Sequence, residues 1–153
     1  MKIWHTTDED YWRAAPSGTA WAGTLAAAGD LQNLKTAIHV LGDPSDEETQ
    51  IVVIIQFPPH YVLARHAHRS DRLEVVLSGS VEIDGQWLGP GDIWTSRAGE
   101  LYGPHAMGPD GCTTMELATV AGAHLLTFDV NGAEVDVDFS DPASLEGLAN
   151  VLR

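Results

Sequence analysis

The sequence predicts an all-β protein, built as a double-sheet jelly-roll barrel with short helices at its ends. Three observations lead to this fold class. At least eight segments of strand length are rich in β-branched and aromatic residues, turn-forming residues separate them at regular intervals, and helix signals occur only near the two ends of the chain. Such a series of short strands favours a jelly roll over any α/β arrangement.

The two ends of the chain and one apolar run stand out from the regular strand pattern. Residues 1–33 form an irregular lead-in to the predicted barrel. Residues 51–55, with the sequence IVVII, are continuously apolar over the length of a strand, which predicts a strand buried on both faces. Near the other end, Asp141 and Pro142 mark the start of a helix that should extend over about 142–152.

The other strands follow from the alternation of apolar and polar residues. Two dipeptides, Asp84-Gly85 and Asn131-Gly132, are typical of tight hairpin turns. Strands are predicted over residues 35–41, 49–57, 75–79, 80–83, 86–88, 93–95, 112–120, 124–128 and 133–139.

Length and charge limit the possible classes of protein. With 153 residues the chain can bury its own core, and we expect a single domain over 1–153 with the barrel at about 34–139. Eight basic against 22 acidic residues give a net charge of -14, which disfavours nucleic acid and anionic membranes as partners and leaves a small molecule. Cys112 is the only cysteine, and no signal peptide or membrane span is evident, so we expect a cytoplasmic protein without disulfides.

Two histidines separated by one residue form the most informative motif. His66 and His68 lie just before a β-branched segment, and alternation along a strand would point both rings to the same side. A third histidine, His105, follows a second glycine-rich turn. Three imidazoles that converge on one point could bind a divalent metal ion such as iron, zinc, nickel, manganese or copper. Each would then hold its second ring nitrogen in a hydrogen bond.

The order of these motifs resembles the cupin superfamily. The similar features are the His-x-His pair, a strand that ends at Gly79, the turn Gly89-Pro90-Gly91-Asp92 and a final histidine before another strand. Residues 103–112 are similar to the subgroup that contains anti-sigma-factor cupin domains and small dioxygenases that cleave diketones. The resemblance implies a metal site made of His66, His68 and His105.

The sequence departs from the cupin pattern at one ligand position. Most cupins have a glutamate four residues after the second histidine, where this chain has Arg72. Glu74 and Asp71 are nearby carboxylates, and either could approach the metal. If the strand phase continues, Arg72 and Glu74 both point into the barrel, and we expect Asp71 or Glu74 to neutralise Arg72 unless Arg72 swings out of the cavity. A strand shifted by one residue would instead place Leu73 inside and both charges in water.

Three functions are compatible with these residues. The resemblance favours a dioxygenase that uses ferrous iron to cleave an enolisable dicarbonyl, with the enolate supplying the charge of the missing glutamate. The second function is a lyase, isomerase or hydrolase in which a metal ion acts as a Lewis acid and Glu74 or Tyr102 moves a proton. The third is a sensor module that binds a metal or ligand without turnover. For all three we expect a homodimer, because the apolar run at residues 51–55 needs cover.

Overall fold

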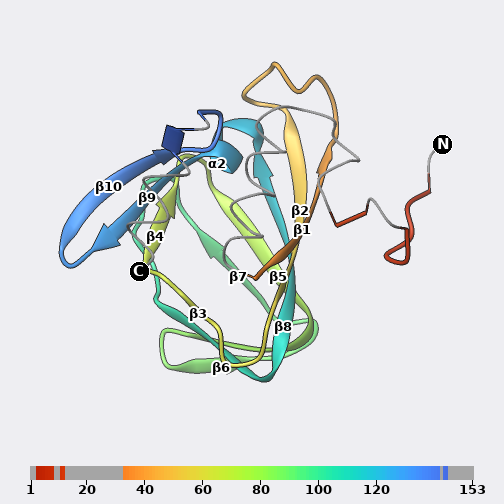
Figure 1. The fold of residues 1–153 in the computed structure, drawn as a ribbon, viewed down its shortest axis with the longest axis vertical. Coiled ribbons are helices and arrows are strands. Elements are labelled where there is room, and N and C mark those ends of the chain that lie inside the picture. The colour runs from red at the N-terminus through yellow and green to blue at the C-terminus, as the bar shows by residue number, and fades with distance from the viewer. Residues whose placement is uncertain (1–2, 9–10, 13–32, 142, 145–153) are drawn as a thin grey trace.

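The computed structural model describes residues 3–8, 11–12, 33–141 and 143–144. Within these residues the chain forms ten strands and the helix α2 (Figure 1). The elements are β1 (Lys35–Val40), β2 (Gln50–Phe57), β3 (Val62–Leu63), β4 (His66–His68), β5 (Arg72–Ile83), β6 (Gln86–Leu88), β7 (Ile93–Ser96), β8 (His105–Thr119), α2 (Val120–His124), β9 (Leu125–Val130) and β10 (Ala133–Asp138). None of the helices described is long and apolar enough to cross a membrane.

The strands form two antiparallel sheets, which confirms the predicted all-β jelly roll (Figure 1). The larger sheet has the order β1-β2-β8-β5-β6, with β3 beside β8 and β7 beside β5. The smaller sheet has the order β10-β9-β4. Residues of both sheets line one cavity. The inner faces of β2, β5 and β8 therefore look across the barrel at β4 and β9.

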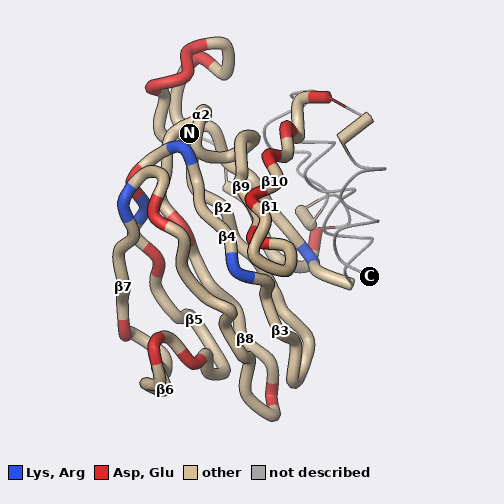
Figure 2. Tube along the Cα trace, turned by 90° about the vertical axis from the view of Figure 1, so that its left-hand side faces the viewer, with Lys and Arg blue, Asp and Glu red and all other residues tan. Residues whose placement is uncertain are grey.

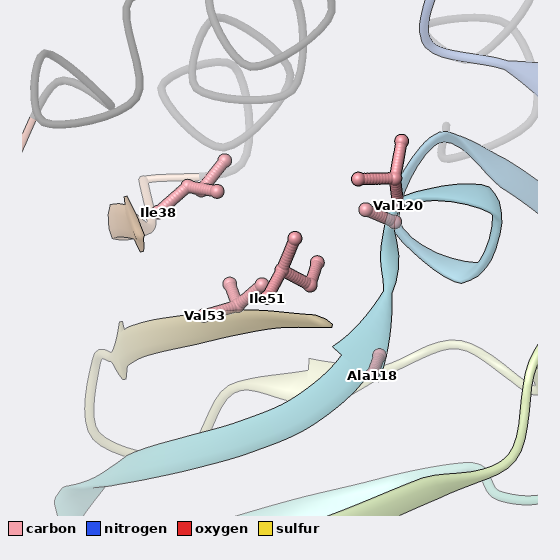
Figure 3. Packing of buried hydrophobic residues seen from close by; sticks show 6 residues of the cluster. Ile38, Ile51, Val53, Ala118 and Val120 are labelled. Atoms are coloured by element: carbon pink, nitrogen blue, oxygen red, sulfur yellow. The ribbon is translucent and has the colours of Figure 1, made fainter. Parts of the chain in front are cut away.

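Strand β2 contains the IVVII run, and the expectation that both its faces are buried is wrong. Ile51 and Val53 are almost fully buried, whereas Val52 and Ile54, which alternate with them, are only partly covered. Figure 3 shows Ile51 and Val53 on the side of β2 that faces Ile38 of β1, with which they form one core cluster. The run is thus a strand with one core face, and its outer face is apolar as well.

Strands β5 and β8 are longer than predicted because glycines allow their backbones to approach closely. Strand β5 continues through Gly79, where the prediction ended it, and β8 begins at His105 instead of Cys112. Gly79 and Gly111 both have a positive φ, and a side chain at Gly79 would collide with the Gly111 carbonyl. Register shifts flank this contact, as expected for β-bulges.

The sequence does not indicate helix α2, because residues 120–124 continue the apolar pattern of the strands before and after them. The helix has small residues that fit against the loop after β4. A side chain at Gly122 would collide with Ser70 of that loop. This close approach brings the carbonyl of Gly122 to the ring of His68. The unpredicted helix therefore contributes to the candidate site.

Most of the lead-in at 1–33 and of the predicted helix at 142–152 lies outside the described residues. Where the helix was predicted to begin, the Asp141 carboxylate accepts a hydrogen bond from the backbone N–H of Ala143 at 3.0 Å. This contact is the one expected of a helix N-cap.

The outer face of the larger sheet has two rows of side chains without any charge. We call these residues the uncharged outer face: Val52, Leu117, Leu73 and Thr95 in one row, and Ile54, Met115, Val75 and Ile93 in the other. Leu73 and Ile93 are 37% and 59% exposed. Figure 2 shows acidic residues gathered at the turn between β1 and β2 and near β6, while β2 has none.

Candidate metal centre

The two histidines of the His-x-His motif lie on the short strand β4 and point into the barrel. Strand β4 pairs with β9, where His66 lies opposite Phe128 and His68 opposite Leu126. Both histidines are buried, and their ring centroids are 4.9 Å apart. The alternation along the strand thus brings the two rings together on one face.

His105 reaches the same region from the start of β8. Its ring centroid lies 6.4 Å from that of His66, and the ring of Tyr102 stands near all three, at 4.7 Å from His66, 6.1 Å from His68 and 5.2 Å from His105. Both ring nitrogens of His105 are buried without a hydrogen-bond partner among the described residues. The backbone of Glu82 lies near this ring but outside hydrogen-bonding geometry.

Backbone carbonyls hold one ring nitrogen of His66 and one of His68. Nδ1 of His66 lies 2.7 Å from the carbonyl oxygen of Ala64, and Nδ1 of His68 lies 3.1 Å from that of Gly122. A carbonyl only accepts, so Nδ1 of His66 donates to Ala64 and leaves the lone pair of Nε2 free for a metal ion. The same holds for His68 when its Nδ1 donates to Gly122. The prediction that all three histidines have such a partner is wrong for His105.

Burial keeps the three imidazoles in the neutral form that can bind a metal ion. Burial lowers the pKa of His66 to about 4, against the opposing hydrogen bond to Ala64. Burial, followed by repulsion from Arg72, lowers the pKa of His68 well below its ordinary value. Burial also lowers the pKa of His105. A neutral imidazole retains the lone pair that a metal ion requires.

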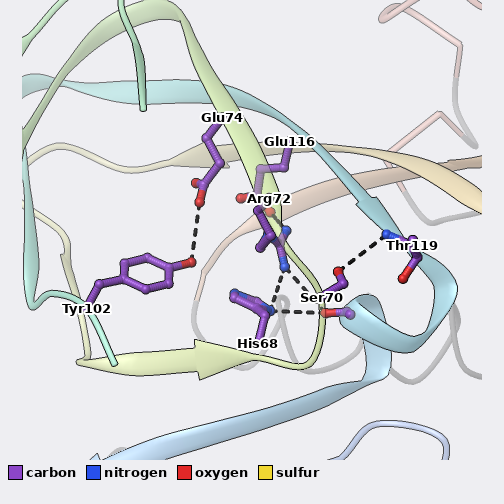
Figure 4. Close-up of polar contacts among 8 residues, drawn as sticks. His68, Ser70, Arg72, Glu74, Tyr102, Glu116 and Thr119 are labelled. Carbon is purple, nitrogen blue, oxygen red and sulfur yellow. Dashed lines mark hydrogen bonds and ion pairs between the residues drawn. The ribbon is translucent and has the colours of Figure 1, made fainter. Parts of the chain in front are cut away.

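Arg72 stands at the position of the expected glutamate and points into the barrel, where it is 5% exposed. Its guanidinium group forms an ion pair with Glu116 and lies 2.5 Å from Nδ1 of His68 (Figure 4). The expectation that Asp71 or Glu74 neutralises Arg72 is therefore wrong. The partner is Glu116, which comes from β8.

The register of β5 against β8 explains this pairing. Glu74 lies directly opposite Glu116, and Arg72 lies two residues before Glu74 on the same face, so Arg72 reaches Glu116 diagonally. The shifted strand is excluded because Leu73 is exposed while both charged neighbours are buried. One signal could have revealed Glu116, since it is the only charged residue between positions 112 and 123.

Glu74 and Tyr102 form another polar contact in the site, besides the ion pair of Arg72 and Glu116. The hydroxyl of Tyr102 donates a hydrogen bond to Oε1 of Glu74 at 3.3 Å (Figure 4). Burial raises the pKa of Glu74 despite the opposing charge of Arg72, and burial together with Glu74 raises the pKa of Tyr102. A carboxyl group with a raised pKa can hold or move a proton near neutral pH. Asp71 is exposed, and its carboxylate accepts a hydrogen bond from the Ala98 N–H at 2.9 Å instead.

Nδ1 of His68 faces two groups that require opposite positions of its proton. The Gly122 carbonyl can only accept a hydrogen bond, and the Arg72 guanidinium can only donate one. When Nδ1 donates to Gly122, Nε2 is free for a metal ion; when Nδ1 accepts from Arg72, the proton lies on Nε2 and blocks it. Nη1 of Arg72 also lies 3.4 Å from the Gly122 oxygen, so it has another acceptor within reach.

A cavity of about 90 Å³ lies between the two sheets, beside the side chains of His68 and Arg72. Its polar end is formed by His66, His68, Arg72 and Glu116, with Thr36 as a further polar residue on its wall. The rest of the wall is apolar and includes Leu34, Val53, Ile55, Leu126, Phe128 and Phe139. A small apolar molecule could therefore lie beside the histidines.

The donor set fits a divalent metal ion. In the part of the chain that the structure describes, no three His, Cys, Asp or Glu side chains already stand at the spacing of ligands around one ion. His66 nevertheless presents Nε2 while Ala64 holds its Nδ1, His68 does the same when its Nδ1 donates to Gly122, and both nitrogens of His105 are buried without a partner among the described residues. An unpartnered buried imidazole is costly, and a metal ion would satisfy one of the two ring nitrogens of His105.

Comparison with known proteins supports the fold. No protein-family model and no curated protein matches the chain. An acetylacetone dioxygenase from Acinetobacter johnsonii has a TM-score of 0.56 at 14% identity, and the match covers 100% of this chain and 94% of that one. An RmlC-like cupin protein from Ralstonia eutropha JMP134 has a TM-score of 0.52 at 14% identity, with 76% and 73% covered.

A third structure, the Rhodobacter sphaeroides complex of SigE with the anti-sigma ChrR, gives a TM-score of 0.46 at 22% identity. This match covers 56% of the present chain and spans only 44% of the other chain. The two similarities with higher TM-scores, together with the sheet topology, show that the protein has the cupin fold.

Proposed function

We propose that the protein is a metal-dependent cupin enzyme that acts on a small organic molecule, with one divalent ion held by His66, His68 and His105. The observation that carries this proposal is the convergence of three buried, neutral imidazoles, two of which are oriented by backbone carbonyls. The apolar cavity beside them supplies space for a substrate.

The reaction we favour is dioxygenase cleavage of an enolisable dicarbonyl. Arg72 and Glu116 cancel each other and the three imidazoles are neutral, so a bound divalent ion would leave excess positive charge at the polar end of the cavity. That charge suits an enolate. A divalent ion would act there as a Lewis acid with positions open for substrate oxygens, and ferrous iron is the ion we favour. One C–C bond is broken and both atoms of O₂ enter the products, so no other oxidant or reductant is needed.

Glu74 and Tyr102 would handle the proton of the substrate in this scheme. Formation of the enolate requires removal of a proton from the carbon between the two carbonyl groups. Glu74 is buried and accepts a hydrogen bond from Tyr102, and burial raises its pKa, which makes its carboxylate a stronger base. The apolar wall of the cavity would keep water away from the reacting carbon.

The test begins with the metal content of protein purified without chelators. We expect about one equivalent of a divalent ion, and we expect the iron-loaded protein to consume one O₂ per diketone cleaved. His105→Ala should lose the metal. The control His5→Ala should keep it, because His5 is exposed and is not part of the proposed site. A His105→Ala protein that retains a full equivalent of tightly bound metal would show that the site is assigned wrongly.

The pair of Glu74 and Tyr102 favours a second candidate function. A carboxyl group that accepts a hydrogen bond from a phenol could move a proton in a lyase, isomerase or hydrolase in which zinc, nickel, manganese or copper acts as a Lewis acid. Turnover by the zinc-loaded protein in the absence of oxygen would select this function over the dioxygenase.

We also propose that two copies of the chain pair through the uncharged outer face. Each copy has a net charge of -14, so charged surfaces of two copies repel each other. The uncharged outer face avoids this repulsion and offers apolar side chains that are only partly covered, among them Leu73 and Ile93. A basic partner would instead be drawn to the acidic turn between β1 and β2.

A further inference from the structure

We propose that Arg72 holds one oxygen of the substrate through its Nε–H group, while the hydrocarbon part of the substrate fills the apolar cavity. This inference rests on the proposed function, because it specifies the substrate class of the same site. Arg72 is 5% exposed, lies on the wall of the cavity, and its Nε is buried without a hydrogen-bond partner in the described part of the protein.

The remaining donors of Arg72 are already engaged. Nη2 donates to the Glu116 carboxylate. Nη1 lies 2.5 Å from Nδ1 of His68 and 3.4 Å from the carbonyl oxygen of Gly122. Nε thus remains as a buried donor that no described group satisfies, although buried donors in proteins nearly always have an acceptor. A ligand oxygen is the kind of group that would complete the set.

The surroundings of Arg72 restrict the chemistry of that oxygen. Glu116 already neutralises the guanidinium, and Glu74 is a second buried carboxyl group nearby. A substrate carboxylate would therefore meet repulsion from Glu116 without gaining an uncompensated cation. A ketone or enolate oxygen fits better, because it accepts a hydrogen bond and brings at most a partial or delocalised charge.

The cavity wall restricts the remainder of the substrate. Apart from its polar end and Thr36, the wall consists of aliphatic and aromatic side chains. Among the described residues, this apolar part of the wall offers no donors for the hydroxyl groups of a sugar or for a second carboxylate. Because Arg72 contacts His68, an oxygen that accepts from Nε also lies beside the histidines. With the proposed function, the substrate class is therefore an uncharged β-dicarbonyl with small alkyl substituents, because the cavity of about 90 Å³ is smaller than the roughly 150 Å³ of a cavity that takes up benzene.

The most direct variant is Arg72→Lys, which keeps a positive charge for Glu116 but has no Nε–H group. The matched control is Arg69→Lys, at an exposed arginine that pairs with Asp136. Binding of pentane-2,4-dione is measured by calorimetry without oxygen, for the metal-free and for the zinc-loaded protein. Loss of one hydrogen bond from a charged donor should weaken binding roughly tenfold to hundredfold in both forms. Arg69→Lys should bind as the wild type does.

A second ligand tests the apolar part of the inference. Wild-type protein should bind pentane-2,4-dione about tenfold or more tightly than 1-phenylbutane-1,3-dione, because a cavity of about 90 Å³ has no room for the phenyl group. Equal affinities, or no measurable binding of either diketone to the wild type, would overturn the proposed substrate class.

The outcomes for Arg72 remain decisive even if one variant folds poorly. An Arg72→Lys protein that melts at the wild-type temperature and binds pentane-2,4-dione with wild-type affinity overturns the role of Arg72. If Arg72→Lys is unstable, the double variant Arg72→Met/Glu116→Leu removes both charges, and wild-type affinity in that protein overturns the inference equally.

Failure of this inference is distinguishable from failure of the proposed function. Wild-type protein that binds no metal, but whose diketone binding still depends on Arg72 in the metal-free form, would refute the metal site and support the role of Arg72. Wild-type protein that binds metal and consumes O₂ with the diketone would support the metal site. If Arg72→Lys then binds the diketone with unchanged affinity, the role of Arg72 is refuted.

Discussion

Arg72 and Glu116 form an ion pair that is almost completely removed from water, and replacing Arg72 alone should destabilise the protein strongly. Their side chains are 3% and 8% exposed. In Arg72→Met the Glu116 carboxylate stays in the barrel without its cation, and breaking a buried pair in this way typically costs about 3–5 kcal/mol. For a chain of this length that loss corresponds to a fall in melting temperature of roughly 6–20 °C.

A double-mutant cycle separates the pair from the packing around it. The cycle consists of Arg72→Met, Glu116→Leu and the double variant, each examined without metal by urea and thermal unfolding followed by circular dichroism. The double variant leaves no buried charge from the pair, so its free energy of unfolding should return to within about 1–2 kcal/mol of the wild-type value or exceed it. The coupling energy should therefore be at least about 2 kcal/mol.

An exposed ion pair in the same protein provides the control. Arg69 and Asp136 lie 3.3 Å apart, with side chains that are 54% and 68% exposed. Because solvent screens this pair, Arg69→Met should cost no more than about 1 kcal/mol. If the Arg72 and Glu116 variants are additive within about 0.5 kcal/mol, the two side chains do not form a buried ion pair, and the charge balance inferred for the site is refuted.

Three further predictions concern pH, metal affinity and assembly. In the metal-free protein, burial lowers the pKa of His66 from 6.5 to about 4, so the unfolded chain takes up a proton that the folded chain does not. The contribution of His66 to the free energy of unfolding should be fully present above pH 6.5. It should fall by about 3 kcal/mol as the pH is lowered through about 4, which urea unfolding at a series of pH values can measure. Arg72→Glu should tighten zinc binding at least about tenfold, because an added anionic donor replaces a nearby cation; unchanged zinc affinity in a competition titration would place residue 72 outside the metal site. Leu117→Lys, which places a charge in the uncharged outer face, should convert a dimer to a monomer in analytical ultracentrifugation, and a wild-type protein that sediments as a monomer would contradict the proposed pairing.

Local signals in the sequence were sufficient for the hairpins and for the orientation of the His-x-His motif. Asp84 and Asn131 adopt positive φ angles of 49° and 55°, as tight hairpin turns require, and each begins the predicted turn. The direction of the rings of His66 and His68 depends only on alternation within one strand. These features require no knowledge of how distant parts of the chain pair.

Features that depend on distant pairing could not be predicted in the same way. The partner of Arg72 lies 44 residues further along the chain, and only the register of β5 against β8 brings it near. The start of β8 was predicted too late because Pro109 and Gly111 suggest a loop, although Gly111 permits the close contact with β5. The run at 51–55 could not reveal how far its outer face is covered, because that depends on what packs against the sheet.

The exchange of a ligand glutamate for Arg72 alters the balance of charge around the proposed metal ion. A glutamate ligand would neutralise half of the charge of a divalent ion, whereas Arg72 alone would add to it. Glu116 cancels the charge of Arg72 by forming an ion pair with its guanidinium group. The Glu116 carboxylate therefore does not neutralise the metal ion. The full charge of the ion therefore remains for the substrate to neutralise. An enolate can supply one negative charge and can also accept a hydrogen bond from the unpartnered Nε of Arg72, so a single substrate oxygen would serve both the ion and the arginine.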